Sequence, residues 1–307
     1  MNLKNEIQRF LDIEIHSNPV PFEILETEKF EEFDRQLISY MGSEKDEIRA
    51  YLFIPTKKKI IGSILVHHQH NGERHLGKSE VARIAGDEFQ NFCPALAKKG
   101  FVTLAPDSIC FEDRRKNMKG ISEDPDPDND VLQHYNELCY RILGGSSLMK
   151  KVIEDSSIAI SLLSNHDLTK DLTIGILGHS YGGNTVIFHS PFDERIQLSC
   201  SSGAVCSYKT KFEHDTGIEM AEVIPGFTQK YDVEDLLKMI NPRKLLILSA
   251  ESDQYARDAK EIYREIRSDF DDPNAIVLKH YEGGHPLDQQ RFDDIIDWFR
   301  QEFENIP

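Results

Sequence analysis

The most reactive pattern in the chain is the pentapeptide Gly178–Gly182, Gly-His-Ser-Tyr-Gly, which matches G-x-S-x-G. A serine hydroxyl is a weak nucleophile until a neighbouring base removes its proton. The pattern exposes such a serine at a strained strand-to-helix turn, where glycines avoid collisions with the strand and the helix. The flanks fit, because residues 172–177 have the composition of a buried strand and residues 184–189 that of a starting helix. We therefore predict that Ser180 is a catalytic nucleophile rather than an incidental serine in a glycine-rich turn.

A serine nucleophile needs a base on a later loop and an acid that fixes the tautomer of that base. Residues 245–253 predict a strand followed by a short loop that bears Asp253. Residues 276–285 predict the next strand, which ends in two glycines and His285. The order Ser, Asp, His is one of those that serine triads use. We predict His285 as the general base and Asp253 as the acid that orients it.

Three other residues compete for these roles. His280 lies inside the last predicted strand, where packing is expected, and Glu251 is the alternative acid two residues before Asp253. His179 adjoins the predicted nucleophile, but its side chain should diverge from that of Ser180, so we expect it to pack or to orient the loop.

Stabilising an oxyanion requires two backbone N–H donors near the nucleophile. The first is expected from Tyr181, at the start of the helix. The second is expected from the loop at residues 67–72, His-His-Gln-His-Asn-Gly, with Gln69 as the donor. The same loop is rich in histidine, which is compatible either with a metal site or with structural hydrogen bonding. Neighbouring side chains in an extended segment point to opposite sides, which favours hydrogen bonding. The candidate ligands were His67, His68, His70 and His75, with Glu73 nearby.

Alternating strands and helices surround these motifs. Residues 33–40 and 48–54 predict an antiparallel hairpin, and short buried strands follow at 60–66, 101–105, 171–177, 197–201, 244–249 and 275–281. Helices are expected over 2–14, 82–99, 131–143, 148–166, 254–268 and 289–304. This alternation is typical of an α/β domain with a mostly parallel sheet and helices on both faces. We expect an N-terminal helical extension at 1–29 and one domain at 30–307, with insertions at about 108–147 and 203–240.

The overall composition limits the partners of the chain. Its formal net charge of −17, from 53 acidic and 36 basic residues, opposes binding to nucleic acid or to an anionic membrane surface. No apolar run approaches the ~18 residues of a membrane helix, and the N-terminal residues alternate charged and apolar side chains, unlike a secretory signal. The five scattered cysteines lack a CxxC pair, which indicates free thiols. We expect a cytoplasmic protein that is able to form a homo-oligomer.

These motifs together resemble the α/β-hydrolase superfamily over roughly residues 45–303. Within it, the sequences His-Gln-His-Asn-Gly at 68–72, Gly-Lys-Ser-Glu at 77–80 and Phe-Val-Thr-Leu-Ala-Pro-Asp at 101–107 look like the dienelactone-hydrolase-like and acetyl-esterase-like branch. True dienelactone hydrolases use a cysteine nucleophile, so the serine at the nucleophile elbow implies hydrolysis of a small ester. The resemblance implies no metal and no organic cofactor. Acyl transfer and small-amide hydrolysis use the same acyl-enzyme and stay open, as does a non-catalytic ligand-binding protein.

Substrate selection is expected from the two insertions above the sheet. The aromatic candidates for the pocket walls are Phe111, Tyr135, Phe212, Phe227 and Tyr231. Two interpretations stay open for the charged residues Asp113, Arg114 and Arg115: contact with a polar substrate, or a solvated loop.

Overall fold

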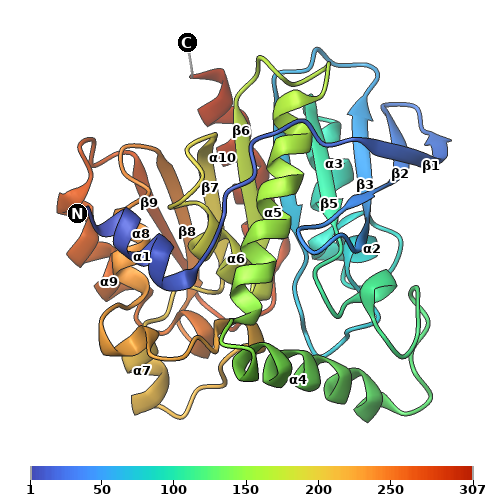
Figure 1. Cartoon of the computed structure of the whole chain (residues 1–307). Helices are drawn as coiled ribbons and strands as arrows, with labels where there is room; N and C mark the ends of the chain where they lie inside the picture. Colours follow the sequence, from blue (N-terminus) through green and yellow to red (C-terminus); the bar gives the residue numbers. More distant parts are fainter. Residues whose placement is uncertain (1, 306–307) are drawn as a thin grey trace.

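Nine strands form one sheet in the order β1-β2-β3-β5-β4-β6-β7-β8-β9 in the computed structural model, which describes residues 2–305 (Figure 1). The strands are β1 (Phe22–Lys29), β2 (Phe33–Met41), β3 (Glu47–Pro55), β4 (Gly62–His67), β5 (Phe101–Pro106), β6 (Ile174–His179), β7 (Ile196–Ser202), β8 (Lys244–Ala250) and β9 (Ile276–Tyr281). From β5 to β9 every neighbouring pair is parallel, whereas β1, β2 and β3 are antiparallel and β3 also pairs antiparallel with β5. The predicted α/β class and the N-terminal hairpin are both confirmed.

The sheet begins at Phe22, which is earlier than the predicted domain start at residue 30. Strand β1 was not expected, because it lies at the edge of the sheet and nearly all of its side chains are exposed. Such a strand carries no alternation of apolar and polar residues, which is the signal that reveals a half-buried strand. Only residues 3–11 of the predicted N-terminal extension are helical.

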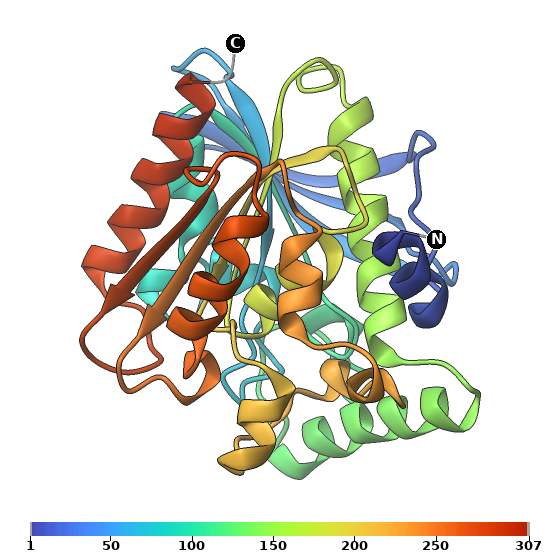
Figure 2. The same cartoon turned by 90° about the vertical axis from the view of Figure 1, so that its left-hand side faces the viewer.

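Helices cover both faces of the sheet. They are α1 (Leu3–Leu11), α2 (Lys78–Val81), α3 (Phe92–Ala97), α4 (Pro127–Leu143), α5 (Leu148–Asn165), α6 (Tyr181–His189), α7 (Tyr208–Glu213), α8 (Val233–Lys238), α9 (Ala259–Ile266) and α10 (Gln289–Glu304). Figure 2 shows α10 on one side of the sheet and α5 on the other. Apolar side chains of α3 and α10 form one core with the sheet, and those of α5, α6, α8 and α9 pack on the opposite face. The central strands β4, β5 and β6 are therefore buried along their whole length.

The segment 82–99, predicted as one helix, instead contains a 3₁₀ turn at Glu88–Gln90 and the short helix α3. After α2, Arg83 and Gly86 both have positive φ angles (59° and 81°), which a continuous helix does not allow. Asp87 then caps a 3₁₀ turn by accepting a hydrogen bond from the N–H of Phe89 at 2.8 Å, and α3 follows. The helix predicted at 254–268 is likewise a 3₁₀ turn at 254–256 followed by α9. Periodicity predicted helical segments here but missed their local interruptions.

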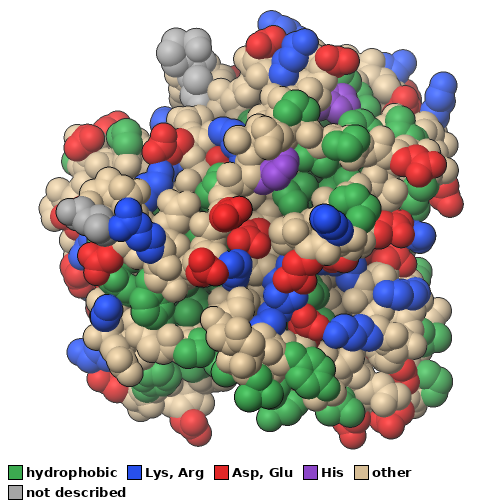
Figure 3. Space-filling view, in the orientation of Figure 1, with side chains coloured by type: hydrophobic (Ala, Val, Ile, Leu, Met, Phe, Trp, Pro, Cys, Tyr) green, Lys and Arg blue, Asp and Glu red, His purple; other side chains and the backbone are tan. Residues whose placement is uncertain are grey.

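Helix α4 crosses the end of the molecule with apolar side chains turned outward. Val131, Leu132, Tyr135, Tyr140 and Leu143 are exposed, and hydrophobic side chains gather along the corresponding lower edge in Figure 3. The opposite side of α4 is buried and includes His134 and Leu138. Within residues 2–305, no helix combines the length and the apolar character needed to cross a membrane.

Candidate active site

Ser180 lies in the tight turn between β6 and α6. Its φ and ψ angles are 55° and −122°, a region that side-chain-bearing residues rarely occupy. The turn is held by the N–H of Ser180, which donates to the carbonyl of Ser202 at 2.8 Å. A Cβ at Gly178 would lie 2.1 Å from the Gly182 backbone, and a Cβ at Gly182 would lie 2.6 Å from the carbonyl of His67. Both glycines are therefore required by backbone contacts, as the pentapeptide predicts.

The structure brings Ser180, His285 and Asp253 together in one hydrogen-bonded row. The Nε2 atom of His285 lies 2.8 Å from the Oγ of Ser180, and its Nδ1 lies 3.0 Å from each carboxylate oxygen of Asp253. Asp253 is 2% exposed, and one of its oxygens also accepts a hydrogen bond from the N–H of Tyr255 at 2.9 Å. The alternative acid Glu251 is exposed and makes no hydrogen bond to His285 in the described part of the chain.

Parallel strand order explains why these residues meet. Strands β6, β7, β8 and β9 are neighbours, so their carboxyl ends lie at one edge of the sheet, where ligands bind in open α/β sheets. Asp253 follows β8 and His285 follows β9. The two loops are tied together by the N–H of Ser252, which donates to the carbonyl of Gly283 at 2.9 Å. His280 stays within β9, and its Nδ1 lies 2.9 Å from the hydroxyl of a β8 serine, so it packs as expected.

Two rings hold the imidazole of His285. His179 stacks on it with ring centroids 4.8 Å apart and planes 30° apart, and Tyr255 meets it edge-on, also at 4.8 Å. His179 is itself buried, with its Nδ1 2.9 Å from the hydroxyl of Ser202. Burial, helped by the nearby His285 and an arginine, holds the pKa of His179 well below its usual value, so its ring is neutral. A Cβ at Gly203 would lie 2.9 Å from His179 and 3.1 Å from His285, so this packing needs a glycine.

Of the predicted oxyanion donors, Tyr181 directly follows Ser180, and Gln69 lies in the loop after β4, the strand that pairs with β6. Tyr181 is the first residue of α6, where a backbone N–H has no acceptor within the helix. Its phenol is turned elsewhere, because the hydroxyl lies 2.7 Å from that of Ser108. Gln69 follows β4, and its side-chain amide donates to Glu80 at 2.8 Å. Only the backbone amides of Tyr181 and Gln69 are therefore candidates for the predicted role.

The histidines after β4 point to different partners. The three buried or half-buried rings bond separately: His67 Nε2 to Ser156 Oγ (2.9 Å), His68 Nε2 to the N–H of Ser108 (3.1 Å), and His70 Nδ1 to Glu219 (3.1 Å). The Nε2 atom of His75 lies 3.9 Å from a carboxylate oxygen of Glu123. Of the two interpretations of this loop, the contacts support structural hydrogen bonding, because the rings bond to separate partners and do not converge on one metal position.

Among the described residues, the one cluster whose ligand atoms converge enough for a metal is formed by Asp107, Glu112 and Asp113. The ammonium group of Lys78 already lies inside this cluster, 2.8 Å from Asp107 and 2.7 Å from Asp113, and it also pairs with Glu112. Lys78 is 1% exposed, so its charge replaces that of a cation. We interpret the cluster as a buried structural ion-pair network that anchors α2.

A pocket of about 370 Å³ opens over Ser180 and His285. Its volume is in the range of small-molecule sites. The walls come from the loop after β4, from the segment after α7, and from Tyr255: His70, Asn71, Gly72, Arg74, Gly217, Ile218, Glu219 and Met220. None of these wall residues was predicted individually as a substrate contact, although the stretch 217–220 lies in the second insertion, 203–240, from which substrate selection was expected. They carry no periodic signal, because they lie on loops that only the fold brings together.

The five aromatic residues predicted as pocket walls do not line this pocket. Phe227 and Tyr231 are buried against Phe10 of α1, because the second insertion packs on the N-terminal helix. Phe111 packs between histidines and Tyr181 in the core. The remaining two, Tyr135 and Phe212, are exposed. Their prediction from the insertions was wrong, since apolar rings there serve core packing or face solvent.

The charged residues of the first insertion are structural too. Arg114 is buried and pairs with Asp46 at 2.5 Å and with Asp155 at 2.7 Å. Arg115 is fully buried and pairs with Asp130 at 2.7 Å. Both arginines are buried and bound to carboxylates of the protein, as buried charges must be. The segment is therefore neither a contact for the substrate nor a fully solvated loop.

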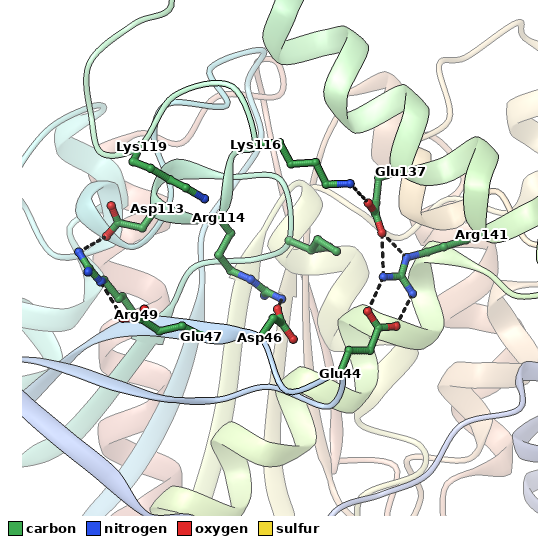
Figure 4. A pocket seen from close by; sticks show the side chains of 11 residues that line it. Glu44, Asp46, Glu47, Arg49, Asp113, Arg114, Lys116, Lys119, Glu137 and Arg141 are labelled. Atoms are coloured by element: carbon green, nitrogen blue, oxygen red, sulfur yellow. Dashed lines mark hydrogen bonds and ion pairs between the residues drawn. The ribbon is translucent and has the colours of Figure 1, made fainter.

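A larger pocket of about 630 Å³ lies between the β2–β3 hairpin and α4 (Figure 4). Ten charged side chains line it, five acidic and five basic. All but Lys119 form ion pairs within the described residues. None of Ser180, Asp253 and His285 lines it, and its paired charges leave no convergent binding group.

Comparison with known proteins identifies the architecture. A candidate acetyl xylan esterase from Bacteroides fragilis superposes with a TM-score of 0.74 at 14% identity, over 98% of this chain and 86% of that one. A glucuronoyl esterase from Solibacter usitatus gives 0.67 at 13% identity, over 98% and 92%. An acetyl xylan esterase from Paenibacillus sp. R4 gives 0.63 at 15% identity, over 98% and 92%. The chain has the α/β-hydrolase fold.

Comparisons that use the sequence alone, with protein-family models and with curated proteins, find no relative. The α/β-hydrolase fold predicted from the motifs is therefore confirmed by structure, at identities that establish the fold and leave the reaction to the geometry of the site.

Proposed function

We propose that this chain is a serine hydrolase that cleaves a carboxylic ester of a small or medium-sized substrate. The observation that carries the proposal is the position of His285, whose two ring nitrogens reach Ser180 and Asp253 at 2.8 and 3.0 Å. This is the arrangement in which a serine becomes a nucleophile at neutral pH. The esterases with the same architecture support ester cleavage over other acyl chemistry.

In the proposed reaction, the Oγ of Ser180 attacks the ester carbonyl carbon while its proton passes to the Nε2 of His285. Asp253 stabilises the imidazolium, and the backbone N–H groups of Tyr181 and Gln69 donate to the oxyanion. The bond to the alcohol breaks, and the alcohol leaves with the proton from His285. Water then attacks the acyl-enzyme and gives its proton to His285, which returns it to Ser180 as the carboxylic acid is released.

The finer assignments are part of the same proposal. The Ser180 turn acts as the nucleophile elbow, and a serine there favours the acetyl-esterase-like side of the dienelactone-hydrolase-like branch. A cytoplasmic location is supported by five unpaired cysteines, four of them buried. The proposed partner is a small ester, without nucleic acid or membrane.

The test compares wild type with Ser180→Ala on p-nitrophenyl esters from acetate to octanoate, together with fluorophosphonate labelling. We expect the variant to lose both hydrolysis and labelling while its circular dichroism is unchanged. Ser252→Ala is the matched control, because this serine is exposed, does not line the pocket and, among the described residues, bonds to Gly283 only through its backbone N–H, which alanine keeps. Undiminished hydrolysis by Ser180→Ala would refute the proposal.

A further inference from the structure

Arg74 lines the pocket above Ser180 and His285, although the proposed reaction does not use it. The residue is 5% exposed, and its Nε donates to the Nδ1 of His134 at 3.1 Å. It forms no ion pair with any residue from 2 to 305. A buried guanidinium normally has a carboxylate partner, because an unpaired charge away from water is costly.

The hydrogen bond to His134 does not neutralise this charge. Burial, helped by the positive charge of Arg74, lowers the pKa of His134 to about 3. The imidazole is therefore neutral near pH 7 and acts only as an acceptor for the Nε–H. The two terminal nitrogens of Arg74 have no hydrogen-bond partner in the described part of the chain, and they are not among its fully buried unpartnered atoms, so a ligand in the pocket could reach them.

The acidic residue that shares the pocket, Glu219, is already engaged. Its carboxylate lies 3.1 Å from the Nδ1 of His70 and also accepts the N–H of Glu222 in a capping box. No hydrogen bond or ion pair joins Glu219 to Arg74 among the described residues. Burial lowers the pKa of Arg74, and the negative charges of Glu219 and Asp130 only partly oppose that shift. The acceptor groups of Glu219 are thus used within the protein, whereas the donors of Arg74 are not.

We propose that Arg74 binds a carboxylate of the substrate, so that the site prefers esters that carry a free carboxylate near the scissile bond. The planar guanidinium fork matches a carboxylate through two parallel N–H···O bonds. The carboxylate supplies the directly hydrogen-bonded counter-charge that Arg74 lacks among the described residues, while the ester carbonyl lies at Ser180 in the same 370 Å³ pocket. This inference rests on the proposed esterase function.

The experiment uses matched methyl esters followed by pH-stat titration: the half esters of succinate and glutarate against the neutral dimethyl esters. We expect wild type to have about 10- to 100-fold higher kcat/KM for a half ester, the range of a hydrogen bond to a charged group. Arg74→Gln should lose most of this ratio, and Arg74→Lys should keep part of it, because a lysine retains the charge without the fork.

The control for net charge is Arg257→Gln, which removes an exposed arginine outside the pocket and should keep the wild-type ratio. Equal losses for both substrates in Arg74→Gln, or a wild type with no preference for half esters, would overturn the inference. If wild type hydrolyses the diesters and Ser180 labels with fluorophosphonate, such a result leaves the esterase proposal intact. Absence of both labelling and hydrolysis would instead overturn the esterase proposal and the inference with it.

Discussion

The imidazole of His179 stacks on that of His285, with centroids 4.8 Å apart and an interplanar angle of 30°. One residue before Ser180, the chain thus supplies a neutral ring that limits where the proposed base can turn. A base held in one orientation keeps its Nε2 in line with the serine hydroxyl, and displacements of about 1 Å cost roughly 100-fold in rate.

Replacing His179 by alanine should therefore lower kcat by about tenfold or more with little change in KM. His179→Phe keeps a ring against His285 but loses the bond to Ser202, so we expect it to recover part of kcat. Steady-state kinetics on one ester, with urea denaturation of each variant, separates positioning from stability. Equal kcat values for the alanine and phenylalanine variants would contradict a positioning role.

Asp253→Asn should retain the shape of the site but lower kcat by about 1,000- to 10,000-fold, because an amide favours the wrong tautomer of the base and cannot stabilise its charged form. The matched control is Glu251→Gln, which changes the alternative acid on the same loop. It should keep wild-type kcat, because Glu251 is exposed. A large loss in Glu251→Gln with a small one in Asp253→Asn would reverse the assignment of the acid.

Gly203→Ala tests the close packing behind the catalytic row. The new Cβ would lie 2.9 Å from His179 and 3.1 Å from His285, at a φ of 62°. Gly120→Ala is the matched control, because Gly120 has a φ of 78° but nothing within 4 Å of its Cβ position. We expect both variants to lose roughly 1 kcal/mol of stability from the backbone conformation. Only Gly203→Ala should also lower kcat, and similar kcat values for both would remove the packing argument.

Glu80 makes stability depend on pH. Burial raises its pKa from 4.5 to about 7, although hydrogen bonds from Gln69 and from the N–H of Asp87 oppose the shift. Between these values the folded chain binds a proton that the unfolded chain has released. Its contribution to stability is therefore complete below about pH 4.5 and is lost as the pH rises through 7.

Glu80→Gln removes this titration, so its stability relative to wild type should rise by up to about 3 kcal/mol between pH 4.5 and 8. Urea denaturation at both pH values measures the difference. Glu88→Gln, an exposed glutamate of the same segment, should show no such change. Parallel curves for wild type and Glu80→Gln would contradict a buried, proton-binding Glu80.

The sequence was informative where a residue follows directly from a buried strand. Ser180, Asp253 and His285 each come just after such a strand, and each strand is visible as a short apolar run. Helix α10 was predicted with the same bounds that the structure gives, because its apolar residues recur at helical spacing. In contrast, the edge strand β1 and the break after α2 lack a periodic signal.

The sequence by itself determined the fold class and the three residues at the sheet edge, because neighbouring parallel strands end at one edge whatever their loops do. Only the tertiary structure decided the pocket walls and the partner of each buried charge. Arg74 and Glu219 are far apart in the sequence, and both line the pocket only because two loops pack beside each other. Phe227 likewise belongs to the core only because Phe10 of α1, distant in the sequence, packs against it. Such contacts depend on the whole chain, since no local spacing relates the residues that form them.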